Sequence, residues 1–116
     1  MSRVILGVSP NAPVEENKQG GKQSSLPYDF TLLPTAAVFE AAKVVKQGAE
    51  KYGEDFSNRN YTKIPTISHI NHAISHLYSY LAGDTSDEHL AHALVRVMFA
   101  VDCDKRDHED ASPDDF

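Results

Sequence analysis

Apolar residues recur every three or four positions between residues 34 and 53, which is the spacing of one face of an α-helix. Pro34 is tolerated in a first helical turn, Thr35 suits a position near the cap, and Gly53 is a common residue after a helix end. The pattern predicts a helix that runs to about Tyr52. Its apolar side contains Ala37, Ala41, Val44, Val45 and Ala49, and a polar stripe beside it contains Glu40, Lys43, Gln47 and Glu50.

Two further helices are predicted after a loop over residues 54–65. The second opens at Pro65 and Thr66, ends at Gly83, and is expected to bury a stripe of Ile70, Ile74, Leu77 and Leu81. The third runs from about Ser86 to Cys103 and is apolar almost all round, as is typical of a helix in the middle of a bundle. Thr85 with Glu88 three residues later predicts a capping box at its start.

The two ends of the chain read differently from this helical core. Residues 4–8 are apolar and fit a strand or an ordered arm, whereas the polar, glycine-bearing residues 11–25 predict a loop. Residues 104–116 are charged and contain Ser112-Pro113, which predicts a disordered tail. The interpretation is an all-α protein with an N-terminal arm and loop (1–33), a helical core (34–103) and an acidic tail (104–116).

Charge and cysteine content narrow the classes of function. Of the net charge of -6, residues 102–116 contribute seven acids against two bases, so the remaining body is close to neutral. No basic stripe is present, which argues against a nucleic-acid partner. The single cysteine, Cys103, excludes an internal disulfide, fits a reducing cytoplasm, and is interpreted as a packing residue. We find no signal-peptide pattern and no apolar stretch of about 20 residues, so neither secretion nor a membrane span is expected.

Histidines and carboxylates gather around the turn between the second and third helices. Five of the six histidines lie within 24 residues, and the turn itself adds three acids. Helical spacing puts each histidine set on one face of its helix, so we expect all of them to meet in one place. Together with Glu40 and Glu50, these imidazoles and carboxylates could bind Mg²⁺ or Mn²⁺ and support a metal-assisted hydrolysis of phosphoric anhydrides. The residues concerned are His69, His72, His76, His89 and His92, with Asp84, Asp87 and Glu88.

Other interpretations of the same residues stay open. A histidine on a helix face is more often a hydrogen-bonded core residue than a ligand. Asp87 and Glu88 in a first turn favour the helix dipole with or without a metal. A zinc or di-iron helical bundle is a third interpretation, but the chain lacks a pair of Glu-x-x-His motifs and has no cysteine pair.

Seven segments occur in an order that resembles a known family. They are Gly21–Ser24, Leu26–Pro34, Gly48–Gly53, Asn60–Lys63, His69–Ala73, His76–Asp84 and Asp87–Ala93. Together, over roughly residues 20–102, they resemble the dATP/dGTP diphosphohydrolases of bacteria and phages, a MazG-like group that includes enzymes of phages with 2-aminoadenine DNA. The joint order is specific even though each segment alone is weak.

The resemblance implies an all-α, MazG-like nucleoside triphosphate pyrophosphohydrolase that uses Mg²⁺ or Mn²⁺. Such an enzyme cuts between the α- and β-phosphates of dGTP or dATP and releases a purine deoxynucleoside monophosphate and pyrophosphate. In a 2-aminoadenine pathway it would supply dGMP. MazG relatives assemble as dimers or tetramers, so a homo-oligomer is expected, in the host cytoplasm if a phage encodes the chain.

The resemblance and the residue chemistry together give a set of expected site residues. The later helix carries His89-Leu90-Ala91-His92 where MazG proteins have Glu-x-x-Asp, and the first helix retains only Glu40 of their Glu-Glu-x-x-Glu stretch. We expect catalysis by His76, Glu88 and His92, and metal binding by Glu40, Glu50, Asp84, Asp87 and Glu88. Substrate binding is expected from Lys22, Lys51, Asn60, Tyr61, Lys63, His72 and Arg96.

Two points of this interpretation have alternatives. Tyr61 either stacks on a base or packs as a turn residue on the bundle. For the function of the whole chain, we expect a purine dNTP as the substrate and favour dGTP over dATP only slightly. The alternatives are a house-cleaning pyrophosphohydrolase for other or modified dNTPs and a non-catalytic helical module that binds nucleotide or metal.

Overall fold

Three α-helices make up most of the protein. The computed structural model describes residues 11–110, with side chains described as far as His108, so the apolar run at residues 4–8 lies outside the described residues. The elements are β1 (Val14–Glu16), β2 (Lys22–Ser24), α1 (Thr35–Tyr52), α2 (Thr66–Leu81) and α3 (His89–Asp110), with short 3-10 turns η1 (Phe30–Leu32) and η2 (Asn60–Lys63). The prediction of an all-α bundle is confirmed.

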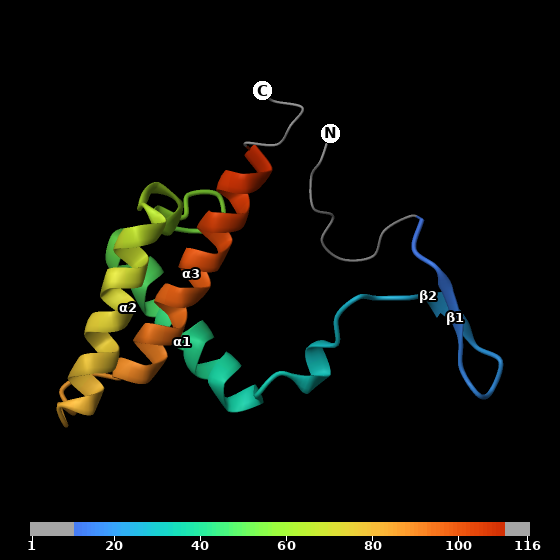
Figure 1. Ribbon diagram of the computed structural model, residues 1–116, viewed down its shortest axis with the longest axis horizontal. Helices are drawn as coiled ribbons and strands as arrows, with labels where there is room; N and C mark the ends of the chain where they lie inside the picture. Colours follow the sequence, from blue (N-terminus) through green and yellow to red (C-terminus); the bar gives the residue numbers. More distant parts are fainter. Residues whose placement is uncertain (1–10, 111–116) are drawn as a thin grey trace.

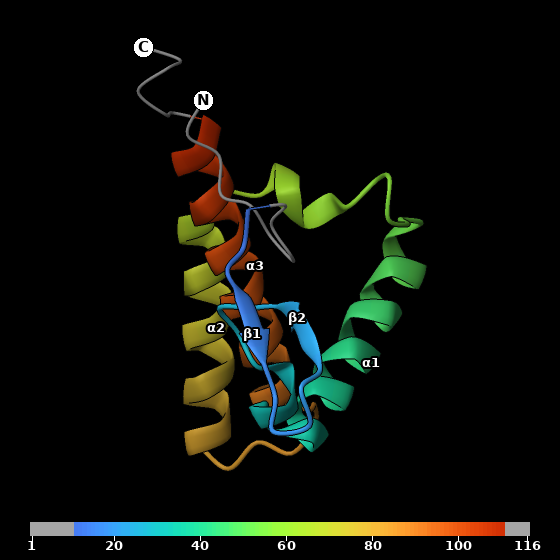
Figure 2. The same ribbon diagram turned by 90° about the vertical axis from the view of Figure 1, so that its right-hand side faces the viewer.

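The helices α2 and α3 lie side by side in opposite directions, and α1 leans against α3 from the other side (Figures 1 and 2). Ala41 and Val44 of α1 pack on Val95 of α3 and form the buried core, with Ala91 and Phe99 partly buried against them. The prediction that the third helix occupies the middle of the bundle is confirmed, because α3 packs against both α1 and α2.

The first two helices have the predicted ends. α1 stops at Tyr52, and Gly53 follows with a φ of 64°, a left-handed conformation in which its N–H donates to the carbonyl of Ala49. α2 begins directly after Pro65, which has no N–H to leave unpaired. Across residues 11–110, none of the helices combines the length and the apolarity that crossing a membrane requires.

The predicted buried stripe of α2 is wrong for the single chain. Its members are 39–77% exposed, and the buried residues of α2 are His69 and Ala73 instead. The face of α2 that meets α3 thus carries Ala73 and the imidazole of His69 in place of large aliphatic side chains. The aliphatic residues left on the other side are Ile70, Ile74, Leu77 and Leu81.

Both flanks are more ordered than predicted. Residues 14–24, expected as loop, form the β1–β2 hairpin, which projects away from the helices in Figure 1. Its turn is closed by the side chain of Asn17, which accepts hydrogen bonds from the backbone N–H groups of Gln19 and Gly21. The start of the predicted disordered tail is helical, since α3 continues to Asp110. Arg106 donates to Asp102 at 2.6 Å, one turn apart, and supports this extension.

Candidate functional site

The turn between α2 and α3 is fixed by the end of α2. Gly83 adopts a φ of 84°, and its N–H donates to the carbonyl of Tyr80. The N–H of Asp84 donates to the carbonyl of Ser79, which completes a Schellman motif. This backbone arrangement sets Asp84 at the start of the turn, where its side chain accepts from both the N–H and the hydroxyl of Ser86.

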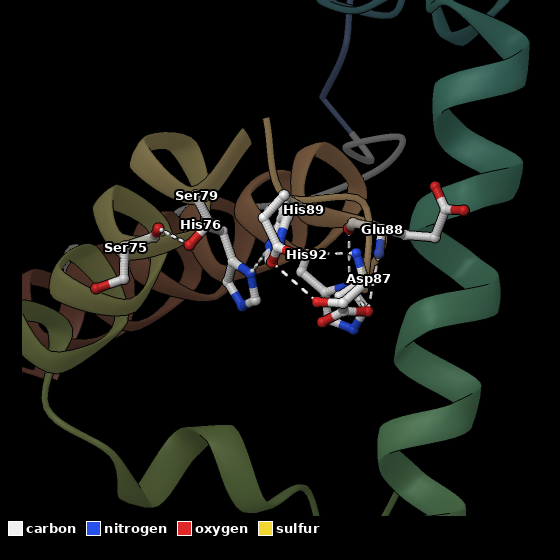
Figure 3. A network of polar contacts seen from close by, with 9 residues as sticks. Ser75, His76, Ser79, Asp87, Glu88, His89 and His92 are labelled. Carbon is white, nitrogen blue, oxygen red and sulfur yellow. Dashed lines mark hydrogen bonds and ion pairs between the residues drawn. The ribbon is translucent and has the colours of Figure 1, made fainter. Parts of the chain in front are cut away.

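His76, Asp87 and His89 converge on this turn (Figure 3). One nitrogen or oxygen of each lies within 4.8 Å of the others, and among residues 11–110 this is the one such set of three side chains. The Nδ1 atoms of His76 and His89 are 3.0 Å apart. His76 comes from the third turn of α2, whereas His89 is the first residue of α3 and only 8% exposed. Two helices and the turn between them thus each contribute one group.

Asp84 orients the ring of His89. The Nε2 atom of His89 lies 2.7 Å from Oδ2 of Asp84, which as a carboxylate can only accept, so Nε2 carries the proton. In the neutral ring this leaves a lone pair on Nδ1, directed at His76. The same hydrogen bond is the main reason why the pKa of Asp84 is lowered.

His92 lies beside the group and is stacked on His76, with ring centroids 5.1 Å apart. Its Nδ1 donates to the carbonyl of Glu88 at 2.8 Å and lies 3.6 Å from a carboxylate oxygen of Asp87. In the neutral ring Nε2 of His92 is then free of a proton. The carboxylate of Glu88 points away from the imidazoles in Figure 3.

The predicted capping box between Thr85 and Glu88 is wrong in its boundary. α3 begins at His89, so Thr85 lies in the turn and not at the helix cap. Asp87 lies near the start of α3 in place of the predicted cap. Its side chain accepts a hydrogen bond from the N–H of Glu88, and its carbonyl accepts one from the N–H of His89. An aspartate just before a helix also stabilises the positive end of the helix dipole.

The pKa of His76 is lowered from its usual value. Burial is the main cause, because it disfavours a charged ring, and the neighbouring rings of His92 and His89 act in the same direction. His76 therefore stays neutral to lower pH than an exposed histidine, with a nitrogen lone pair available.

The prediction that all five histidines meet is wrong for His69 and His72. His69 is completely buried and belongs to a separate aromatic cluster with Tyr61 and Phe99. Its Nε2 donates to the carbonyl of Tyr61 at 3.0 Å, and its Nδ1 accepts from Arg96 at 3.2 Å. This histidine has both ring nitrogens paired and serves as a structural residue.

A comparison with known protein families places this geometry in context. The family described as dATP/dGTP diphosphohydrolase, N-terminal, matches residues 17–112, which span α1 to α3 and the turn with its imidazoles. The chain belongs to this family. No curated protein and no solved structure matches the chain.

In this member of the dATP/dGTP diphosphohydrolase family, several expected site residues lie on other elements. Glu40 and Glu50 are exposed on α1, where Glu40 pairs with Lys43 at 3.8 Å, and neither belongs to the His76–Asp87–His89 group. Lys51 lies over the ring of Tyr52, also on α1, and Lys22 pairs with Glu16 across the hairpin. Their expected roles remain predictions.

A second set of expected substrate-binding residues lies at the opposite end of α2. Asn60, Tyr61 and Lys63 form η2, directly before α2, whereas His76 is ten residues into that helix, about 15 Å along its axis. Tyr61 is stacked on Phe99 with centroids 4.2 Å apart, and its hydroxyl donates to Asp102 at 2.8 Å. The face of the Tyr61 ring that contacts Phe99 is therefore occupied by packing.

His72 lines a shallow, open depression along α2. The depression has a volume of about 410 Å³, and its other lining residues are Ile67, Ser68, Ile70, Asn71 and Ile74. It lies on the outer side of α2, with the exposed aliphatic residues.

His89 belongs to the predicted histidine cluster but receives no catalytic, metal-binding or substrate-binding role there, although it is the most buried member of the group. The sequence did contain a signal for it. Gly83 marks the end of α2, and Asp84 comes directly after it, five residues before His89 and close enough to reach that ring across the turn.

Cys103 is buried as predicted, and burial raises the pKa of its thiol, which does not suit a nucleophile.

Proposed function

We propose that the protein is a metal-dependent pyrophosphohydrolase of purine dNTPs. It cleaves dGTP, and dATP less readily, between the α- and β-phosphates and releases the monophosphate and pyrophosphate. The observation that carries the proposal is that the family match at residues 17–112 includes a group of imidazoles and carboxylates able to hold a cation. In a phage with 2-aminoadenine DNA, the product dGMP would feed synthesis of that DNA.

The donors of the α2–α3 turn fit a divalent cation, with Mg²⁺ or Mn²⁺ as the expected cofactor. Asp87 supplies a carboxylate oxygen, and His76 and His89 supply neutral imidazole nitrogens. When bound, such an ion neutralises phosphate charge and lowers the pKa of a water molecule. Asp84 holds the ring of His89 in place.

His92 is suited to accept the proton of the attacking water. Its Nδ1–H donates to the carbonyl of Glu88, which fixes the tautomer and leaves Nε2 as the acceptor. The carboxylate of Glu88 is the other candidate for this role, and Arg96, one turn beyond His92, is a candidate to bind phosphate oxygens.

Incubation of the protein with each dNTP, in Mg²⁺ or Mn²⁺, tests the proposed activity. We expect dGTP to give dGMP and pyrophosphate, resolved by ion-exchange chromatography, with dATP slower and the pyrimidine nucleotides slowest. Faster turnover of pyrimidine or modified dNTPs would favour the house-cleaning alternative. Nucleotide binding without turnover in either metal would favour the non-catalytic module, and release of orthophosphate would contradict cleavage between the α- and β-phosphates.

The proposal includes assembly into a homo-oligomer, either a dimer or a tetramer. Like α2, α3 carries half-exposed aliphatic residues, and Leu90, Leu94, Val97 and Met98 are 38–50% exposed. Monomeric proteins rarely expose large apolar surfaces, so we infer that these residues of α2 and α3 contribute to an interface. A second copy of the chain would cover them.

A charge placed on this surface should break the oligomer. Ile74 is 45% exposed on α2, and we expect Ile74→Glu to shift the protein to a monomer in multi-angle light scattering, because a carboxylate at an apolar interface loses its hydration. Gln47→Glu on the polar stripe of α1 adds the same charge and is expected to leave the mass unchanged. An Ile74→Glu variant with the parent mass would exclude this face of α2 as the interface.

A further inference from the structure

We propose that His76, Asp87 and His89 form a site for a first-row transition ion, bound in preference to Mg²⁺, with Asp84 as a positioning residue. This inference rests on the proposed function and deepens it, since it names the chemistry of the ion and the atoms that bind it. The site uses two imidazoles and one carboxylate, a donor set that the all-carboxylate metal sites of MazG-type sequence patterns do not contain.

The tautomer of His89 favours an ion at this site. Because Nε2 donates to Asp84 at 2.7 Å, the Nδ1 lone pair of His89 points into the group. A carboxylate that holds one ring nitrogen while the other binds the ion is the usual outer arrangement of metal-binding histidines, where it fixes the ring and increases ligand basicity. Asp84 is itself held by the Schellman turn and by Ser86, so this orientation exists before any ion binds.

Two imidazole nitrogens of the group approach each other closely. The Nδ1 atoms of His76 and His89 lie 3.0 Å apart. Without an ion, they can form a hydrogen bond only if one of the two nitrogens carries a proton and donates it to the lone pair of the other. Two nitrogens that bind one ion at about 2.0–2.1 Å stand about 2.8–3.4 Å apart for bond angles between about 90° and 109°. The observed separation of 3.0 Å lies within this range.

The donor atoms also determine which ion is preferred. Mg²⁺ favours oxygen ligands and keeps much of its water, whereas imidazole suits the borderline ions of the first transition row. Asp87 supplies the remaining charge from a partly exposed position, which leaves room for water or phosphate oxygens on the open side of the ion. Two nitrogens and one carboxylate oxygen on one side are also the donors of mononuclear sites for Fe²⁺ with open positions.

Titration of the whole protein with Co²⁺, followed by its visible absorption bands, tests the site without any nucleotide. We expect one equivalent to bind and at least about 1,000-fold more Mg²⁺ than Co²⁺ to be needed for displacement. His89→Gln and Asp87→Asn should each weaken Co²⁺ binding about 100-fold or more, and Asp84→Asn about 10- to 100-fold. His108→Gln, which removes an exposed imidazole at the far end of α3, should bind Co²⁺ as the parent does.

The outcomes separate this inference from the proposed function. Equal affinity for Co²⁺ in the parent, His89→Gln and Asp87→Asn proteins would overturn the site, as would displacement of Co²⁺ by equimolar Mg²⁺. In Asp87→Asn the amide oxygen can still accept the hydrogen bond from the N–H of Glu88, so circular dichroism is expected to show the parent's helix content. A protein that binds Co²⁺ as described but turns over no dNTP would keep the site and refute the hydrolase. A protein that hydrolyses dNTPs but does not bind Co²⁺ through these residues would support the hydrolase and refute the metal site.

Discussion

Replacement of Asp87 with asparagine is expected to lower kcat/KM for dGTP hydrolysis about 100-fold or more. Asp87 is the carboxylate of the His76–Asp87–His89 group, and an amide in its place keeps the shape but removes the negative charge that holds the cation. A 100-fold loss corresponds to about 2.7 kcal/mol of transition-state stabilisation. Initial rates of pyrophosphate release at saturating Mn²⁺ measure the effect.

Asp104→Asn is the matched control for that change. Asp104 is an exposed aspartate of α3 that pairs with His108 at 3.5 Å, remote in the chain from the turn. Its variant is expected to keep the parent kcat/KM. If Asp87→Asn retained more than half of the parent rate, Asp87 would have no part in the mechanism, and Glu40→Gln and Glu50→Gln would then test the α1 carboxylates as the metal ligands.

His69→Ala is expected to lower the free energy of unfolding by about 2–4 kcal/mol. The change empties a completely buried position between α2 and α3 and leaves Arg96 without the ring nitrogen to which it donates. A loss of this size is a large fraction of the stability of a typical single domain. Urea denaturation followed by circular dichroism at fixed protein concentration and pH 7 measures it.

His72→Ala provides the comparison, because His72 is exposed on the same helix and its loss should change the free energy of unfolding by less than about 0.5 kcal/mol. A His69→Ala protein as stable as the parent would contradict a structural role for His69.

The pH dependence of the free energy of unfolding provides a second test of the role of His69. Burial lowers the pKa of His69 and of His76, so the unfolded chain binds more protons than the folded one once the pH falls below about 6.5. The contribution of these two histidines to the free energy of unfolding is therefore at its full value above that pH. It decreases as the pH falls toward the lowered pKa values. His69→Ala should show a smaller decrease over this range than the parent.

The helices were predictable because their ends are encoded locally. Gly53 marks the end of α1 and Pro65 the start of α2. Gly83 follows the C-terminal cap residue of α2 and marks the end of that helix. The buried face of α2 was not predictable, because hydrophobicity identifies an apolar stripe but not what covers it. Ala73 and His69 face α3 within the chain, and the larger aliphatic residues face outward. The extension of α3 escaped prediction because its charges are paired one turn apart and do not repel.

The convergence of candidate side chains was predictable where they are close in sequence. His76, Asp87 and the neighbouring Asp84 meet because α2 and α3 are joined by one short turn, so sequence spacing already implies their proximity. Glu40, Glu50 and Lys22 depend on how α1 and the hairpin pack, which spacing does not determine. The Tyr61–Phe99–His69 cluster was missed for the same reason, since η2 and α3 are about 40 residues apart in the chain.

The short chain distance between His76 and His89, 13 residues, has a consequence for how the protein reaches its folded state. Closing so short a loop costs little conformational entropy, and contacts between adjacent helices form among the earliest during folding. The pair of helices that presents the imidazoles can therefore assemble before α1 docks. An ion captured at that stage would accelerate folding as well as stabilise its product, and the metal supply during synthesis would influence the yield of folded protein.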